Sequence, residues 1–151
     1  MTDQPSNRFG HATEQLDEAI SLFLEGQSVS GLKLAGAADE IFCKALSDSG
    51  QQNSLDLKHE VMEPILTMRN QTKEDFIRDE NRALNVIKDM ASATDPSVTL
   101  DLEEAAYSMI VRACHNHDLL GLPRTAKMRE FQDWFYEHVV GLGGPLPEYE
   151  V

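Results

Sequence analysis

Residues 30–46 carry the strongest structural signal in the chain, in the segment SGLKLAGAADEIFCKAL. Apolar side chains recur there at helical spacing in two adjacent rows, which together form a broad stripe that requires burial. The rows consist of Leu34, Ala38, Ile41 and Ala45, and of Ala35, Phe42 and Leu46. Because glycine and alanine dominate the first half of the segment, a neighbouring helix can approach closely there. We therefore expect a central helix against which other helices pack.

Further segments with helical periodicity predict an all-α protein, a single-domain bundle of about six helices. The chain of 151 residues is long enough to bury a sizeable core without disulfides. Its sequence contains no alternating strand pattern, internal repeat or low-complexity tract. We expect a flexible N-terminal arm over residues 1–11, the bundle over residues 12–141 and an extended tail over residues 142–151. The first helix is predicted to start at about Ala12.

Polar residues mark the expected starts of later helices. Ser28 or Ser30 can cap the central helix, because a serine hydroxyl accepts a hydrogen bond from a backbone N–H of the first turn. Thr72 and Thr125 are suited to the same role in the helices that follow them. Asp101, with a glutamate three residues later, predicts a capping box for the helix after it.

Two features predict where helices are interrupted. Pro64 lacks a backbone donor and clashes with the preceding turn, so we expect a kink or break near Glu63. From Thr72, one helix is expected to continue with Met90 on its apolar side and to end in the segment ATDPS at residues 93–97.

The charge and cysteine content restrict the function classes. Thirteen basic against 26 acidic residues give a net charge of −13, which repels nucleic acid, so nucleic-acid binding is not expected. Cys43 and Cys114 have no partner at metal or redox spacing and are expected to be buried thiols in a reducing compartment. Neither a secretory signal nor a membrane-spanning run is recognisable, so we predict a cytoplasmic protein without membrane contact.

The predicted helix after Asp101 contains the densest group of reactive side chains. His117 continues an apolar stripe and is predicted to be a hydrogen-bonded core histidine, while Arg112 and His115 are predicted to lie in a solvated polar row. His115 and His117 point about 200° apart on a helix, so they cannot bind one metal ion together. No cofactor motif or complete set of metal ligands occurs, and we predict neither a cofactor nor a metal.

Two acidic side chains of the central helix are further candidates for a reactive site. Asp39 and Glu40 could form a pair of acids, but they are predicted to lie at the solvent edge of the helix. A small-molecule pocket among the small residues of the same helix is a further hypothesis that the sequence leaves open.

Two segments carry a resemblance, LAGAADEIFCKAL and ALNVIKDM followed by DPSVTLDLEEAAYSMIVRA. They resemble an uncharacterised bacterial family of small all-helical proteins over most of residues 14–140. The resemblance implies a helical fold and brings no activity with it. The layout is more distantly similar to HEPN domains, up-and-down helical bundles that include ribonucleases and inactive dimerisation or partner modules. Asp89 stands where the bacterial family shows a histidine.

We favour a non-catalytic helical module for self-association, as a homodimer, or for binding a protein partner. Aromatic side chains cover more than one side of the last predicted helix, which is typical of an interface but equally of a core. These interface candidates are Phe131, Trp134, Phe135 and Tyr136.

The alternative is a HEPN-like, metal-independent endoribonuclease. The signature of that class is an arginine followed, after four to six residues, by a histidine, and only Arg112 with His117 fits it. Arg112 would position a phosphate and His117 would act as acid or base. Because these positions lie about 140° apart on a regular helix, they would converge only through a kink or a subunit interface.

Overall fold

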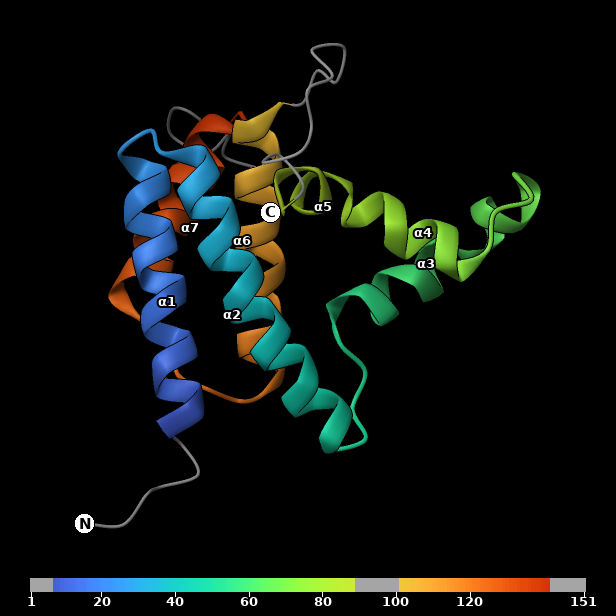
Figure 1. Ribbon diagram of the computed structural model, residues 1–151, viewed down its shortest axis with the longest axis horizontal. Helices are drawn as coiled ribbons and strands as arrows, with labels where there is room; N and C mark the ends of the chain where they lie inside the picture. Colours follow the sequence, from blue (N-terminus) through green and yellow to red (C-terminus); the bar gives the residue numbers. More distant parts are fainter. Residues whose placement is uncertain (1–6, 89–100, 142–151) are drawn as a thin grey trace, which may run out of the picture.

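The computed structural model describes residues 7–88 and 101–141, which form seven α-helices without a strand in these ranges (Figure 1). The helices are α1 (Asn7–Leu24), α2 (Ser28–Asp48), α3 (Ser54–Met68), α4 (Lys73–Glu80), α5 (Arg82–Lys88), α6 (Leu102–Leu119) and α7 (Ala126–His138). The predicted all-α class is therefore confirmed. None of the described helices is long and apolar enough to span a bilayer.

The central helix is α2, which packs against both α1 and α6. Its second apolar row is buried as predicted, with Phe42 inaccessible to solvent. The predicted close approach also occurs, because a Cβ atom built on Gly31 would lie 3.1 Å from the backbone oxygen of Ala19 in α1. A Cβ on Gly36 would lie 2.9 Å from the side chain of Leu84, so α5 approaches a second glycine of α2. Glycine thus sets the distance between α2 and two of its neighbours.

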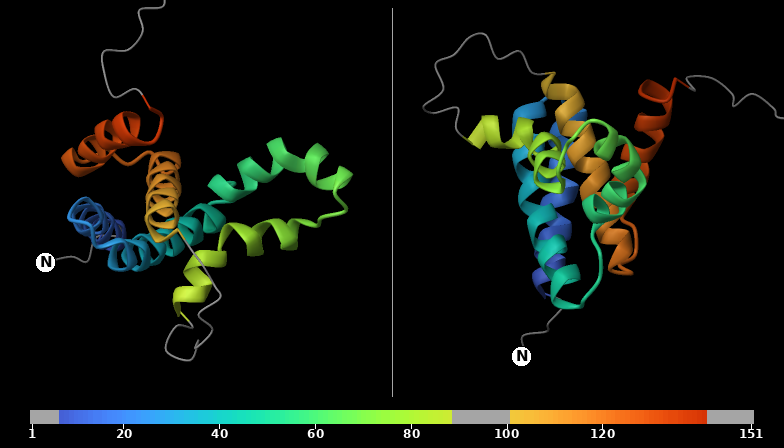
Figure 2. Two further views of the ribbon diagram at one scale, coloured as in Figure 1. Left: turned by 90° about the horizontal axis from the view of Figure 1, so that it is seen from above. Right: turned by 90° about the vertical axis from the view of Figure 1, so that its right-hand side faces the viewer.

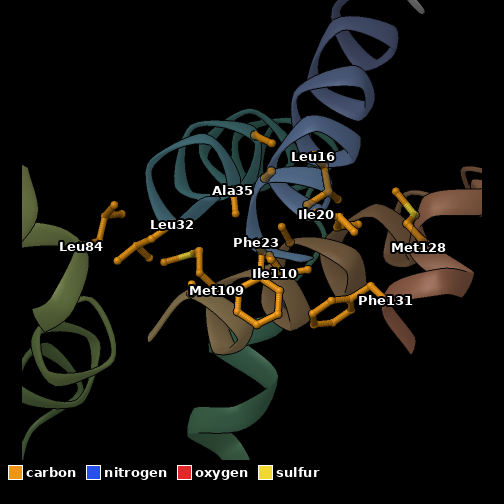
Figure 3. Packing of buried hydrophobic residues seen from close by; sticks show 14 of the residues in the cluster. Leu16, Ile20, Phe23, Leu32, Ala35, Leu84, Met109, Ile110, Met128 and Phe131 are labelled. Carbon is orange, nitrogen blue, oxygen red and sulfur yellow. The ribbon is translucent and has the colours of Figure 1, made fainter. Parts of the chain in front are cut away.

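The core joins α1, α2, α5, α6 and α7 (Figure 3). Phe23 of α1 lies where three helices meet, with its ring centroid 4.7 Å from that of Trp134 and 6.0 Å from that of Phe131 in α7. Tyr107 of α6 makes a further edge contact with Phe23 at 6.5 Å. Figure 3 also shows Leu84 of α5 directed toward the side chains of the main bundle. The predicted stripe of α6 is buried between these elements.

The helices α3 and α4 form a pair that extends away from the main bundle (Figures 1 and 2). Each helix of this pair contributes one buried residue, Leu66 in α3 and Phe76 in α4. Phe76 contacts the imidazole of His59, with 5.7 Å between the ring centroids. The pair therefore has almost no core of its own.

Three of the predicted caps are confirmed. The side chains of Thr72, Asp101 and Thr125 each accept a hydrogen bond from a backbone N–H three residues later. The cap of α2 was predicted wrongly, because Gln27 precedes the helix and Ser28 already lies inside it. The reason is the short α1–α2 turn, in which Gly26 adopts a positive φ of 86° and brings the N–H of Gln27 to the α1 carbonyls.

Other helix boundaries also differ from the prediction. The helix α1 begins at Asn7, before Ala12, and α3 continues through Pro64 without a break. Pro64 lies on the exposed face of α3, where water can bond the carbonyl that loses its partner. The helix predicted from Thr72 is divided at Asn81, whose N–H closes the last turn of α4. Met90, Asp89, the ATDPS segment, residues 1–6 of the predicted arm and the tail lie outside the described residues.

Candidate functional site

A buried ion pair joins α2, the longest described helix, to α6. The Nε of Arg112 donates to Oδ2 of Asp39 at 3.0 Å, and the two side chains are only 13% and 4% exposed. The Nδ2 of Asn116 donates to the other carboxylate oxygen at 2.6 Å. The predictions of an exposed Asp39 and a solvated Arg112 are therefore wrong. Both residues face the α2–α6 contact, where each neutralises the other's buried charge.

The same network reaches the start of α3. Asn116 accepts a hydrogen bond from the backbone N–H of Ser54 through its Oδ1 at 2.7 Å. The Ser54 hydroxyl lies 2.9 Å from Nδ1 of His115. Asn116 therefore uses both ends of its amide, one toward α2 and one toward α3, and connects the extended helix pair to the bundle.

A cleft lies beside this network, between α6 and the segment formed by α3, α4 and α5, with a volume of about 580 Å³. Arg112 and Ser108 of α6 line it on one side, and Lys58 and Arg82 line it on the other. Within the described residues, only Asp39 accepts a hydrogen bond from the Arg112 guanidinium, and it does so from Nε. In this part of the chain the terminal amino groups of Arg112 have no further acceptor, and Arg112 lines the cleft.

His117 lies on another side of α6. It is 1% exposed, and its ring contacts Phe42 edge-on, with 5.5 Å between the centroids. The expected core position is confirmed, but the expected hydrogen bond is not: within the described residues Nδ1 has no hydrogen-bond partner, and Oδ1 of Asp118 lies 3.9 Å from it. Arg112 faces Asp39 and the cleft, so the structure does not bring the two candidates for an endoribonuclease together.

We expect His117 to make the protein less stable in acid. Burial lowers the pKa of His117 from its ordinary value of 6.5, against the opposing effect of the Asp118 carboxylate. Below about pH 6.5 the unfolded chain therefore binds a proton that the folded chain excludes. The free energy of unfolding consequently decreases as the pH is lowered. Urea unfolding of the protein and of His117→Leu, at about pH 7.5 and pH 5.5, should show a smaller pH effect in the variant. His11→Leu, at an exposed histidine, is the control, and an equal pH effect in all three proteins would contradict this expectation.

The two cysteines are both partly buried free thiols. Burial, aided by the Asp39 carboxylate, raises the pKa of Cys43 to about 12. Burial and Asp118 raise the pKa of Cys114 to about 12 as well. Both side chains are therefore protonated at neutral pH, which makes them poor nucleophiles.

The four aromatic interface candidates of α7 differ in exposure. Phe131 is buried in the core, while Trp134 and Phe135 pack partly against it. Tyr136 is 48% exposed. A groove of about 290 Å³ runs between α6 and α7 and is lined by Phe135 and Tyr136, with Arg124 bound to Asp118 at its edge. The aromatic face of α7 therefore serves mainly the core.

A larger exposed apolar surface lies on α3. We call it the α3 row, and it consists of Leu57, Val61, Ile65 and Met68. Val61 is 78% exposed, Ile65 42% and Met68 85%. Helical spacing in the sequence predicts that these side chains share one face, but it does not reveal that this face points away from the chain's own core.

The structure also shows what sequence reasoning missed. Asn116 was not a candidate, although it lies one turn after Arg112 on the same side of α6. Asp39 occupies the one position missing from the row Ala35, Phe42 and Leu46, four residues after Ala35. This position in the sequence could have indicated that Asp39 is buried, and an acid within a buried apolar row requires a partner.

The described residues contain no group of three or more His, Cys, Asp or Glu side chains that could hold a metal ion. Comparison of the chain with family models, with curated proteins and with solved structures finds no match. Functional inference therefore rests on the surfaces and side chains described above.

Proposed function

We propose that this chain is a non-catalytic cytoplasmic module that forms a homodimer through the α3 row. The observation that carries the proposal is the exposure of Val61 and Met68, at 78% and 85%, in a row that helical spacing places on one face of α3. Single exposed apolar residues are ordinary on protein surfaces, but a contiguous patch is typical of an interaction site. The α3 row extends over most of the helix and lies on the part of the molecule that projects from the bundle.

The small core of the α3–α4 pair supports the same proposal. Two helices bury little apolar surface by themselves, and here only Leu66 and Phe76 are buried within them. Packing two such pairs together would produce a four-helix arrangement with the α3 rows at its centre. Each buried apolar side chain of this size would contribute about 1.5–3 kcal/mol of transfer free energy.

The charges beside the α3 row favour a second copy of the chain as the occupant. The whole chain has a net charge of −13, which opposes self-association elsewhere on the surface. Helical geometry places Arg69, the C-cap of α3, on one flank of the row, beside Lys58, which is paired with Glu80 at 2.8 Å, and Glu60 on the other. Two α3 helices that lie side by side in the same direction would therefore oppose basic and acidic flanks.

The proposal predicts the mass of the protein in solution. Light scattering behind a sizing column should give twice 16.9 kDa for the wild type at high concentration. The double variant Val61→Glu/Met68→Glu should give 16.9 kDa, because it places four carboxylates in the dimer contact. Its fold should be retained, since both side chains are exposed in the single chain.

The matched control is Tyr136→Glu/Val140→Glu, which changes two exposed apolar residues at the other end of the described chain. It should leave the dimer intact. A wild type that stays monomeric at high concentration would overturn the proposal. Loss of the dimer in the control but not in the α3 variant would also overturn it and would assign the interface to α7.

A further inference from the structure

The cleft beside Arg112 has the features of a binding site and shares no residue with the α3 row. Its floor holds a guanidinium that is largely buried yet borders a volume of about 580 Å³. Because Nε is bound to Asp39 at 3.0 Å, the orientation of the planar group is fixed before any ligand arrives. Asp39 is itself held by Asn116 at 2.6 Å, so the anchor is rigid.

A fixed guanidinium with unused terminal amino groups is suited to a carboxylate. Its planar N–H groups match the two oxygens of that group and form charge-assisted hydrogen bonds. Within the described residues no acceptor occupies these donors. The hydroxyl of Ser108, one turn before Arg112 on α6, lines the same wall and can donate to the same ligand.

The remaining charges of the cleft select against a simple anion. Lys58 is bound to Glu80 at 2.8 Å, so this base is already neutralised. Four acidic side chains line the cleft against three basic ones, and one of these bases, Arg112, is already paired with a fifth acid, Asp39, which does not line the cleft. A ligand with a cationic group in addition to its carboxylate would therefore be favoured over a phosphate or a dicarboxylate.

Glu104 is the best placed acid for such a cationic group. It lines the cleft on the same face of α6 as Ser108 and Arg112, at intervals of four residues. Eight residues of helix separate the backbones of Glu104 and Arg112 by about 12 Å, which exceeds the charge separation in an α-amino acid. Leu55 and Ala83 add apolar surface to the lining of the cleft.

We propose that this cleft binds a small zwitterion whose carboxylate and ammonium are separated by a short aliphatic chain. The carboxylate pairs with Arg112, the chain lies against the apolar wall and the ammonium faces Glu104. The site is independent of dimer formation, because none of these residues belongs to the α3 row.

Three probes of equal chain length test this assignment: 6-aminohexanoate, hexanoate and hexylammonium. Titration followed by amide NMR shifts should show that 6-aminohexanoate binds most tightly, by about fivefold over either singly charged probe, as one added partly exposed ion pair allows. Glu104→Gln should reduce the affinity for 6-aminohexanoate to that for hexanoate. Ser108→Leu should weaken binding of 6-aminohexanoate and of hexanoate, because it removes the hydroxyl that lines the cleft one turn before Arg112, without touching the Asp39–Arg112 pair.

Glu103→Gln is the matched control, because Glu103 is exposed on the adjacent position of α6 and does not line the cleft. It should bind as the wild type does. Equal affinity for all three probes, or a Glu103→Gln effect as large as that of Glu104→Gln, would overturn the proposal. So would the absence of shifts at cleft residues at saturating 6-aminohexanoate.

Discussion

Replacing Asp39 with alanine is expected to lower the free energy of unfolding by about 3–5 kcal/mol, which is typical when one partner of a buried ion pair is removed. The variant leaves the guanidinium of Arg112 buried without its counter-charge. It also removes the acceptor of the Asn116 amide and thereby loosens the link to α3. Urea unfolding followed by circular dichroism measures the loss.

Two further variants separate the ion pair from a general effect of mutation. Glu18→Ala changes an exposed acid of α1 and should cost no more than about 0.5 kcal/mol. The double variant Asp39→Leu/Arg112→Met removes both charges and should recover most of the loss, because well-packed apolar residues can replace a buried pair. If Asp39→Ala were as stable as Glu18→Ala, the ion pair would not have the role in folding that its burial implies.

Phe42→Ala is expected to have an effect of similar size, with a loss of about 3–5 kcal/mol for a fully buried phenylalanine. The ring is inaccessible to solvent on α2 and contacts the imidazole of His117 on α6. Its removal creates a cavity at the contact of the two helices and takes away the ring that packs on His117. Thermal or urea unfolding gives the size of the loss.

Tyr136→Ala is the control for this second variant. Tyr136 is also aromatic, but it is 48% exposed and lies at the edge of the α7 cluster. We expect a loss of less than about 1 kcal/mol there. Equal losses at the two positions would contradict the assignment of α2 as the central helix.

The main bundle could be predicted because its signals are local. Apolar rows at helical spacing identify α2 and α6, and side-chain caps at Thr72, Asp101 and Thr125 place three helix starts. The start of α2, where Gln27 makes no side-chain cap hydrogen bond, was misplaced. The start of α2 at Gln27 is set by the backbone turn at Gly26 and not by a capping side chain. Such a turn depends on how the two helices meet.

The ion pair could not be predicted from the same rules. Asp39 and Arg112 are separated by 73 residues, so only the packing of α2 on α6 brings them together. Each residue alone fits a solvated helix face, which is the commoner place for a charged side chain. Their burial becomes favourable only because each supplies the other's counter-charge.

The α3 row illustrates a different limit. Its spacing predicts an apolar face correctly, but a single chain does not show whether that face is covered by its own core or by another copy. Leu66 lies on the opposite side of α3 and is the residue that packs within the chain.

The most direct test of the proposed dimer is hydrogen–deuterium exchange of the wild type at low and high protein concentration. We expect peptides covering residues 57–68 to gain protection as the protein concentration rises, while peptides from α1 and α7 do not change. Concentration-dependent protection confined to α7, or none at all in α3 at the highest concentration, would contradict the proposed dimer.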